Sequence, residues 1–351
     1  MGVSGQSATT RIGLAEIARL AEVSEATVSR VINRRPGVST KTRATVERAM
    51  AELNMTRPTE GEMVLAIVPE LSNDVFTRLA EQIEAELSPF GLHTLVCAAL
   101  PGSSKERDFA AATVGVGIAG AIFLSASNTL SRGDHSAQQM LRDRRVPFVN
   151  VNGGAGGIPA ATFSTNDWRA AELAIDHLTA LGHRRIGMLA GPPGNLLADR
   201  RIEGFFAALR KHGLDDENAL LERQLFTVDG GRRGGDLLID RGATAIVAAS
   251  DRMALGAVNA AFRRGMSVPG DLSVVGYDDS PMLDLTAPPL TTVRQPTERL
   301  AQHAAQALHV LISGNHVNED EVLIDPELRI RSSTGGWAEK PRKRQKPQAR
   351  P

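Results

Sequence analysis

The chain has 351 residues, of which 42% are hydrophobic, 4% are aromatic and one, Cys97, is a cysteine. That length supports more than one domain with a sizeable core. A lone cysteine excludes an internal disulfide, the N-terminus lacks the regions of a signal peptide, and no apolar run approaches the roughly 20 residues that cross a bilayer. Composition therefore argues against secretion and a membrane span, and predicts a cytoplasmic protein.

The 40 basic and 40 acidic residues cancel, but they are unevenly placed. Residues 1–57 are net +4 and residues 338–351 are net +5, which leaves net −9 for residues 58–337. Basic ends on an acidic body are typical of a polyanion-binding module joined to a domain with another task. We expect residues 1–10 and the basic tail 335–351 to be disordered. The charge of the tail either binds a polyanion or only adds solubility.

Three short helices are predicted first along the chain, in residues 11–57. Apolar residues recur at the spacing of one helix face in each, namely Leu14, Ile17, Ala18 and Ala21, then Val28, Val31 and Ile32, then Val46, Ala49, Met50 and Leu53. Ser24 and Ser39 are good N-caps for the second and third helices. Only a few residues separate the first two helices, which is typical of a helix-turn-helix motif.

The second helix of this motif carries the candidate DNA contacts, because it offers its outer face to the major groove. Arg30 is suited to a bidentate contact with guanine, and Ala26 to contact with a thymine methyl group. Thr27, Ser29 and Lys41 are suited to phosphate contacts. The full predicted DNA-binding set is Ser24, Glu25, Ala26, Thr27, Ser29, Arg30, Asn33 and Lys41. The alternative is a small helical bundle without a DNA-binding role.

Short apolar runs alternate with helical patterns in the rest of the chain. The expected strands are 63–68, 93–98, 121–124, 146–150, 161–163, 185–189, 243–248 and 272–277, and the expected helices are 76–87, 105–114, 167–180, 201–211 and 252–264. This alternation predicts two consecutive doubly wound parallel sheets with helices on both faces. Ligands of such folds bind beyond the carboxyl ends of the strands, and two facing units form a cleft there.

The residues of the motif carry a family resemblance. The stretch from Leu14 to Leu53, with 23–33 and 38–43 inside it, resembles the headpiece of the lactose-repressor (LacI/GalR) family of bacterial transcription regulators. The resemblance continues at 182–186, 191–192, 201–205, 250–256, 268–279 and 289–295, and covers roughly residues 11–334. It implies an all-α helix-turn-helix headpiece followed by a two-lobed α/β core like that of type I periplasmic binding proteins.

The same resemblance implies how the core, residues 63–334, is divided. The N-subdomain is expected at about 63–160 and 291–320 and the C-subdomain at about 161–290 and 321–334, with three crossovers near 161, 291 and 321. By position in the family pattern, the effector-binding residues are Asn73, Phe76, Asp167, Trp168, Arg201, Ser250, Asp278 and Gln295. Asp278 ends an apolar strand and Asp167 follows another, so both can project into the crevice, where charged groups would bind a polyhydroxylated or anionic ligand.

Two departures from the family pattern affect these expectations. The linker, residues 58–62, is about two helical turns shorter than the linker of the family, which contains a hinge helix, and it has no leucine to wedge into the minor groove. We therefore expect weaker operator bending than in relatives with a hinge helix, as measured by a circular-permutation gel-shift assay. Residues 229–233 are small and charged where sugar-binding relatives often have an aromatic residue. Sugars are the common effectors of the family, so the resemblance favours a carbohydrate effector. Arginines in the cleft would also suit a sugar acid or a phosphate.

The resemblance implies a sequence-specific repressor with no catalytic residues, cofactor or metal. It would bind a pseudo-palindromic operator as a homodimer in the cytoplasm, on the nucleoid when bound to DNA. Residues 115–120 match the dinucleotide fingerprint G-x-G-x-x-G, but a helix precedes them and a strand follows, which is the reverse of the functional order. Two alternatives are a two-lobed solute-binding protein without a regulatory role and a sugar- or nucleotide-modifying α/β enzyme. The first would need an export signal and no helix-turn-helix, and the sequence shows the opposite. The second would need a nucleophile, metal set or phosphate loop, and the sequence shows none.

Overall fold

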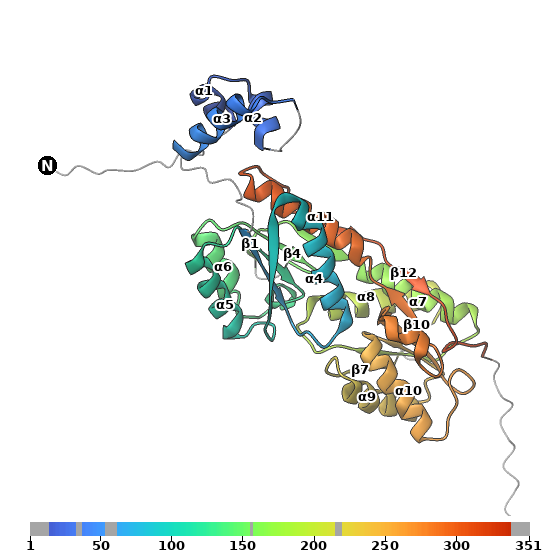
Figure 1. Cartoon of the computed structure of the whole chain (residues 1–351). Helices are drawn as coiled ribbons and strands as arrows, with labels where there is room; N and C mark the ends of the chain where they lie inside the picture. Colours follow the sequence, from blue (N-terminus) through green and yellow to red (C-terminus); the bar gives the residue numbers. More distant parts are fainter. Residues whose placement is uncertain (1–13, 33–36, 53–61, 155–156, 215–219, 338–351) are drawn as a thin grey trace, which may run out of the picture.

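The computed structural model describes residues 14–32, 37–52, 62–154, 157–214 and 220–337. It consists of a small helical headpiece and a two-lobed α/β core, as the sequence predicts (Figure 1). Within these described ranges no helix is long and apolar enough to cross a membrane.

The headpiece contains α1 (Leu14–Leu20), α2 (Glu25–Ile32) and α3 (Thr40–Glu52). Its core is the predicted set of inward-facing residues, Ile17, Ala18, Ala21, Val28, Val31, Val46, Ala49 and Met50. The predicted core position Leu53, like the side chain of Ile32, lies outside what the structure describes. The helical periodicity of the sequence therefore predicted both the three helices and their shared interior.

The first lobe is a sheet with the strand order β11-β5-β4-β3-β1-β2, in which every pair is parallel. Its strands are β1 (Glu62–Val68), β2 (Leu92–Ala98), β3 (Gly120–Leu124), β4 (Phe148–Val151), β5 (Thr162–Thr165) and β11 (Glu321–Ile324). One face packs on α4 (Asp74–Leu87) and α11 (Thr297–Ile312), and the other on α5 (Ser104–Val116) and α6 (Ser136–Asp143). Both faces are covered, so the central strands β1 and β3 are apolar along nearly their whole length rather than alternating.

The second lobe has the strand order β12-β10-β9-β8-β6-β7. Its strands are β6 (Ile186–Ala190), β7 (Leu220–Arg223), β8 (Ala245–Ala248), β9 (Ser273–Asp278), β10 (Thr291–Arg294) and β12 (Glu327–Arg329), of which β12 alone is antiparallel to its neighbour among the described pairs. The helices α7 (Asp167–Ala180) and α8 (Leu196–Lys211) cover one face, and α9 (Val228–Asp240) and α10 (Asp251–Arg263) cover the other.

The chain passes between the lobes three times, from β5 to α7, from β10 to α11 and from β11 to β12. Each crossing lies a few residues after the positions near 161, 291 and 321 that were expected from the sequence. The reason is that β5, β10 and β11 each complete the sheet of the lobe that the chain is about to leave.

The structure adds elements that the sequence pattern did not predict, namely α6, α9, α11, β7, β10, β11 and β12. Helix α9 is the most instructive, because it contains four glycines, which are poor helix formers in isolation. A Cβ atom on Gly231 would lie 2.2 Å from the carbonyl oxygen of Met253 in α10, and one on Gly256 would lie 2.2 Å from that of Val228. The glycines therefore allow α9 and α10 to pack backbone against backbone, and this packing stabilises the helix.

The prediction that disorder begins at residue 335 is wrong for its first residues. The backbone nitrogen of Trp337 donates to the carbonyl oxygen of Leu181 at 2.7 Å, and its ring stacks on His183 at 5.7 Å between centroids. His183 is itself buried and hydrogen-bonded to the hydroxyl groups of Thr244 and Ser273. Residues 1–10 and 338–351, the remainder of the predicted disordered ends, lie outside the described residues.

Candidate DNA-binding and effector sites

The N-terminal cap of α2 fixes the start of the candidate recognition helix. The Ser24 hydroxyl accepts a hydrogen bond from the backbone nitrogen of Thr27 at 3.2 Å, and the two hydroxyl groups are 2.8 Å apart. Ser39 caps α3 in the same way, with the backbone nitrogen of Thr42 at 3.1 Å. Both caps are those that the sequence predicted, and each satisfies a backbone donor that the helix start would leave unpaired.

One side of α2 is turned away from the headpiece core. Val28 and Val31 are fully buried, which leaves the opposite side of the helix to solvent. Glu25, Ala26 and Arg30 are exposed on that side. Of the other predicted DNA contacts, Ser24 and Lys41 are exposed, Thr27 and Ser29 are half-buried, and Asn33 lies outside the described residues. The exposed side offers a guanidinium, a carboxylate and a methyl group at helical spacing.

The predicted effector residues lie where strands end. Asp278 is the last residue of β9 and Gln295 follows β10, while Asp167 begins α7 directly after β5. Asn73 and Ser250 are the N-caps of α4 and α10, which follow β1 and β8. Because the carboxyl ends of parallel strands meet at one edge of a sheet, these residues from both lobes are placed between the lobes.

A chain of hydrogen bonds joins Asp278 and Gln295 to the first lobe. The Gln295 amide donates to the Asp278 carboxylate at 2.7 Å, and its oxygen accepts from Asn152 and Thr165, each at 3.1 Å. The side chain of Asn73, in the first lobe, also lies near Asp278 and acts to lower its pKa. Asp278 holds a backbone φ of 124°, which L residues rarely adopt, and such strain is concentrated at functional sites.

Arg201, Asp167 and Tyr277 form a second, buried group. The Arg201 Nε atom donates to the Asp167 carboxylate at 2.6 Å, and its guanidinium lies 3.7 Å over the Tyr277 ring. The Tyr277 hydroxyl donates to the same carboxylate oxygen at 2.9 Å. The second carboxylate oxygen of Asp167 is buried and has no hydrogen-bond partner in the described part of the chain. It is thus an acceptor available to the hydroxyl group of a ligand.

Asp251 is a second buried carboxyl group, close to Asp278. Burial raises the pKa of Asp278 to about 6, although Arg201 and Gln295 act in the opposite direction. Burial and the nearby Asp278 also raise the pKa of Asp251 well above its ordinary value. Asp251 accepts hydrogen bonds from the Thr292 hydroxyl at 2.5 Å and the backbone nitrogen of Ser280 at 2.9 Å. It thereby holds the loop that follows Asp278.

Three of the predicted residues do not join these groups. Ser250 uses its hydroxyl to cap α10, accepting from the backbone nitrogen of Met253 at 3.3 Å. Phe76 packs, partly buried, against the core of the first lobe. The Trp168 indole donates to Glu203 at 3.1 Å and lies 5.1 Å from the Arg200 guanidinium, on the side of α7 that faces α8. The effector roles of all eight residues stay predictions.

The structure places two further side chains at the same edges. The Phe226 ring lies against Gly191, where a Cβ atom would be 2.1 Å from its Cζ atom, beyond the carboxyl ends of β6 and β7. An aromatic ring therefore stands just before the small and charged residues 229–233. Asn152 follows β4 with a φ of 59°. An asparagine after an apolar strand was a usable signal for the second, whereas no local pattern marks the first.

Direct contacts also hold the lobes together on one side of these groups. Arg78 in α4 donates to the backbone oxygens of Asp278 and Asp279 at 3.0 and 3.1 Å. The Ser280 hydroxyl donates to the Asp74 carboxylate at 2.7 Å. Since Asp278 is also a candidate effector-binding residue, a ligand that moved Asp278 would change the contacts of Arg78 in α4.

The lobes meet again through an isolated bridge, in which Leu130 pairs with Asn195. The backbone nitrogen of Ser131 donates to the Gly194 oxygen at 3.0 Å beside it. The two lobes are thus in direct contact at a second place.

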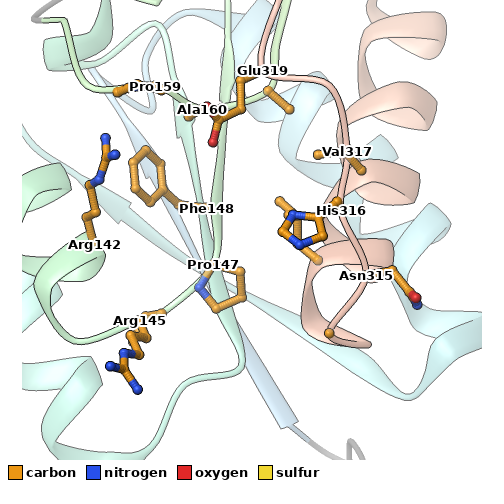
Figure 2. Close-up of a pocket in the computed structure, with 14 residues that line it drawn as sticks. Arg142, Arg145, Pro147, Phe148, Pro159, Ala160, Asn315, His316, Val317 and Glu319 are labelled. Atoms are coloured by element: carbon orange, nitrogen blue, oxygen red, sulfur yellow. The ribbon is translucent and has the colours of Figure 1, made fainter. Parts of the chain in front are cut away.

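The edge of the first sheet opposite the crevice has a cavity of about 630 Å³. It lies between the end of α6, the start of β4 and the loop after α11 (Figure 2). Its lining includes Arg142, Arg145, Phe148, His316 and Glu319 but none of the predicted effector residues. The cavity is therefore separate from the candidate effector site.

Comparison with known families gives two matches. Residues 13–57 match a family described as bacterial regulatory proteins, lacI family, and residues 175–334 match one described as periplasmic binding protein-like domain. The HTH-type transcriptional regulator MalR of Streptomyces coelicolor is 41% identical over 336 residues, covering 93% of this chain and 97% of that protein.

Two solved structures are similar in fold. A complex of the transcriptional regulator CelR with cellobiose has a TM-score of 0.71 and 30% identity, and covers 92% of this chain and 99% of that chain. The lac repressor dimer bound to operator and the anti-inducer ONPF has a TM-score of 0.68 and 26% identity, and covers 93% and 100%. The similarity extends across headpiece and core in both cases.

Proposed function

Because the chain belongs to the LacI family of bacterial regulatory proteins, we propose that it is a transcriptional repressor whose operator affinity is set by a small molecule held between its lobes. The observation that carries this proposal is the pairing of an exposed, capped α2 with a strained polar cluster between the lobes. The first is a surface for reading DNA, and the second is a site that a ligand can rearrange.

The DNA contact is assigned to the outer side of α2. Arg30 is exposed and can place two donors on guanine N7 and O6, while Ala26 is small enough to approach a thymine methyl group. The first backbone N–H groups of the helix, at Glu25 and Ala26, can donate to a phosphate. One headpiece reads only a half-site, so a pseudo-palindromic operator requires two copies of the chain.

The dimer contact is assigned to the outer edge of β2. This strand is the last of its sheet, so one row of its backbone donors and acceptors has no strand beside it within the described residues. Leu95 and Val96 are each 38% exposed there, and Leu100 just beyond is 76% exposed. A second copy of this chain, brought by a two-fold operator, would cover that edge.

The effector is assigned to the carbohydrate class. Asp278 and the free oxygen of Asp167 can accept hydrogen bonds from ring hydroxyl groups, and Arg201 and Asn73 can donate to them. Phe226 adds an aromatic surface at the rim of the second lobe. Cellobiose in the CelR complex is a ligand of the same class. A sugar acid or sugar phosphate would instead require a guanidinium that is not already bound to a carboxylate.

The location of the protein in the cell follows from this function. We place the protein in the cytoplasm, associated with the nucleoid when it binds an operator, and acting without catalysis. The names of the relatives as transcriptional regulators support this placement.

A thermal-shift screen of sugars, sugar acids and nucleosides, followed by gel shifts with the DNA upstream of the gene, tests the proposal. A ligand at 100 times its Kd adds about 2.7 kcal/mol of stability. We expect one sugar to stabilise the protein and to change its affinity for one specific duplex. A stabilising ligand without any preference among DNA sequences would instead identify a solute-binding protein.

A further inference from the structure

The length of the linker limits how far one edge of the core can lie from the headpiece. The chain enters the core at Glu62, the first residue of β1, and only the nine residues 53–61 separate it from the end of α3. Nine residues reach roughly 30 Å even when fully extended. Every strand of the first sheet runs parallel, so the amino ends of β3 and β4 lie along the same edge as Glu62. This edge is therefore the part of the core nearest to a bound operator.

The corner between α6 and β4 lies on that edge. Phe148, at the start of β4, pairs with Ala121 in β3, which in turn pairs with Leu65 in β1. Neighbouring strands are about 4.8 Å apart, so the start of β4 is about 10 Å from Leu65, three residues after the start of β1. Figure 1 shows α6 and the start of β1 at the same end of the core. Residues 142–145, which join α6 to β4, share this position.

Three arginines stand in this corner without a carboxylate. Arg142, Arg144 and Arg145 are exposed, and within the described ranges none of their side chains forms an ion pair or hydrogen bond. Other arginines of the core have a carboxylate partner, as Arg200 has Glu321 at 2.5 Å and Arg264 has Asp240 at 2.6 Å. Three guanidinium groups within four residues, none of them paired with a carboxylate of the described chain, concentrate positive charge in this corner.

The backbone of Arg145 is also unusual. It has a φ of 58°, the left-handed conformation that commonly ends a helix on glycine. An arginine at this position carries a strain that glycine would avoid. Figure 2 shows Arg142 and Arg145 at the side of the cavity formed by α6 and β4. Side chains in such conformations are concentrated at functional positions, which favours a role for Arg145 beyond ending α6.

The acidic groups near the corner do not neutralise it. Asp143 lies between the arginines and accepts a hydrogen bond from Gln139, while Glu319 and Asp320 belong to the loop across the cavity. Residues 142–145 carry net +2, on a body that is net −9 over residues 58–337. An acidic core held near a duplex is repelled by its phosphates, and cations on the facing edge offset that repulsion.

We propose that Arg142, Arg144 and Arg145 form a second DNA contact, which binds backbone phosphates beside the half-site without reading its sequence. This inference rests on the proposed function, since it requires the headpiece to hold the core beside an operator. Phosphate contacts of this kind release counterions, so each one steepens the fall of affinity with salt. The contact adds affinity for every duplex and leaves discrimination to α2.

The test compares the parent protein with the variant R142Q/R144Q/R145Q. Its affinity for the selected operator and for an unrelated duplex is measured between about 50 and 200 mM salt, where phosphate contacts dominate the salt dependence. We expect affinity for both duplexes to fall by the same factor. The slope of log K against log salt should flatten by about 0.9 for each phosphate that an arginine no longer neutralises. The ratio of the two affinities should stay unchanged.

The variant R184Q/R263Q/R299Q is the matched control, because it removes the same charge from three exposed arginines that lie away from this edge. Equal thermal unfolding of all three proteins shows that each is folded. The inference is overturned if the salt slope of R142Q/R144Q/R145Q equals that of the parent, or if the control variant changes by the same amount. If the slopes are equal and inorganic phosphate stabilises only the parent protein, the arginines bind a small phosphate ligand and not DNA. A parent protein without DNA preference would contradict the proposed function itself.

Discussion

The headpiece and the crevice between the lobes expose their candidate functional groups in opposite ways. In the headpiece Glu25, Ala26 and Arg30 are exposed on the outer side of one eight-residue helix. In the crevice they are buried, come from both lobes and are hydrogen-bonded to one another. Residues of the first kind act almost independently, whereas residues of the second kind are energetically coupled. Substitutions in the two regions should therefore differ in size and in additivity.

The largest effect is expected from Arg201→Met. It leaves the Asp167 carboxylate buried without its cation, which should lower the free energy of unfolding by about 3–5 kcal/mol. Adding Asp167→Asn removes the uncompensated charge and should recover part of this loss, and the four denaturation curves of the double-mutant cycle measure the coupling. Additive losses would show that the two side chains do not depend on each other.

The next effect concerns the scaffold of the second lobe. Gly231→Ala places a Cβ atom 2.2 Å from a backbone oxygen of α10 and should lower the free energy of unfolding of the core by about 3 kcal/mol. Gly115→Ala is the control, because it is also helical but has open space around it, and should raise that free energy by up to about 1 kcal/mol. Urea denaturation of both variants measures the difference. Equal effects would mean that α9 and α10 are not packed so closely.

A smaller effect is expected in the headpiece. Arg30→Ala should reduce, by about 1–3 kcal/mol, the preference of the protein for its operator over a duplex in which the contacted guanine is replaced. Thermal unfolding should stay unchanged because the Arg30 side chain is exposed. Competition gel shifts with the two duplexes measure this loss. Undiminished discrimination would remove Arg30 from the set of base contacts.

An effect of similar size is a pH dependence of the crevice. The folded pKa of Asp278 is raised to about 6, so the folded protein binds a proton that the unfolded chain has already lost between about pH 4 and 6. Asp251 is shifted in the same direction, and Arg201, Arg78, Asn73 and Gln295 are the other polar groups that face Asp278. The contribution of Asp278 to stability is therefore present at low pH and is lost as the pH rises through 6.

Comparing the parent with Asp278→Asn isolates this contribution from other titrations. The stability of the parent relative to the variant should rise by up to about 1.4 kcal/mol per pH unit as the pH falls from 6 to 4. Chemical denaturation at several pH values measures this difference. A difference that is constant with pH would show that Asp278 is not desolvated as the structure indicates.

The same contrast explains what the sequence could predict. Apolar periodicity and two capping serines are local signals, and they predicted the headpiece helices and the side of α2 that faces outward. Buried parallel strands such as β1 and β9 are short apolar runs, so they too were predicted. The helicity of α9 was not predictable, because its glycines are favourable only against the backbone of α10. Sequence spacing also could not show that the Phe226 ring lies against Gly191.

The crevice was predicted in part for the same reason. The ends of strands marked Asp278 and Asp167, but not the buried Asp251 that holds the next loop, because an acidic residue in the first turn of a helix is ordinary in any sequence. Trp168 follows Asp167 directly and still turns to Arg200 and Glu203 on the surface of the second lobe. Three-dimensional contacts decide which neighbour in the sequence faces the crevice.

The most direct test measures the affinity of the purified protein for its upstream DNA, and for a half-site variant of that DNA, with and without a sugar selected by thermal shift. The account predicts that the natural site is preferred through Arg30, and that the sugar changes this affinity in the parent but not in a folded variant with a substituted Asp278. Equal affinity for both duplexes, or a sugar effect that survives the substitution, would contradict it.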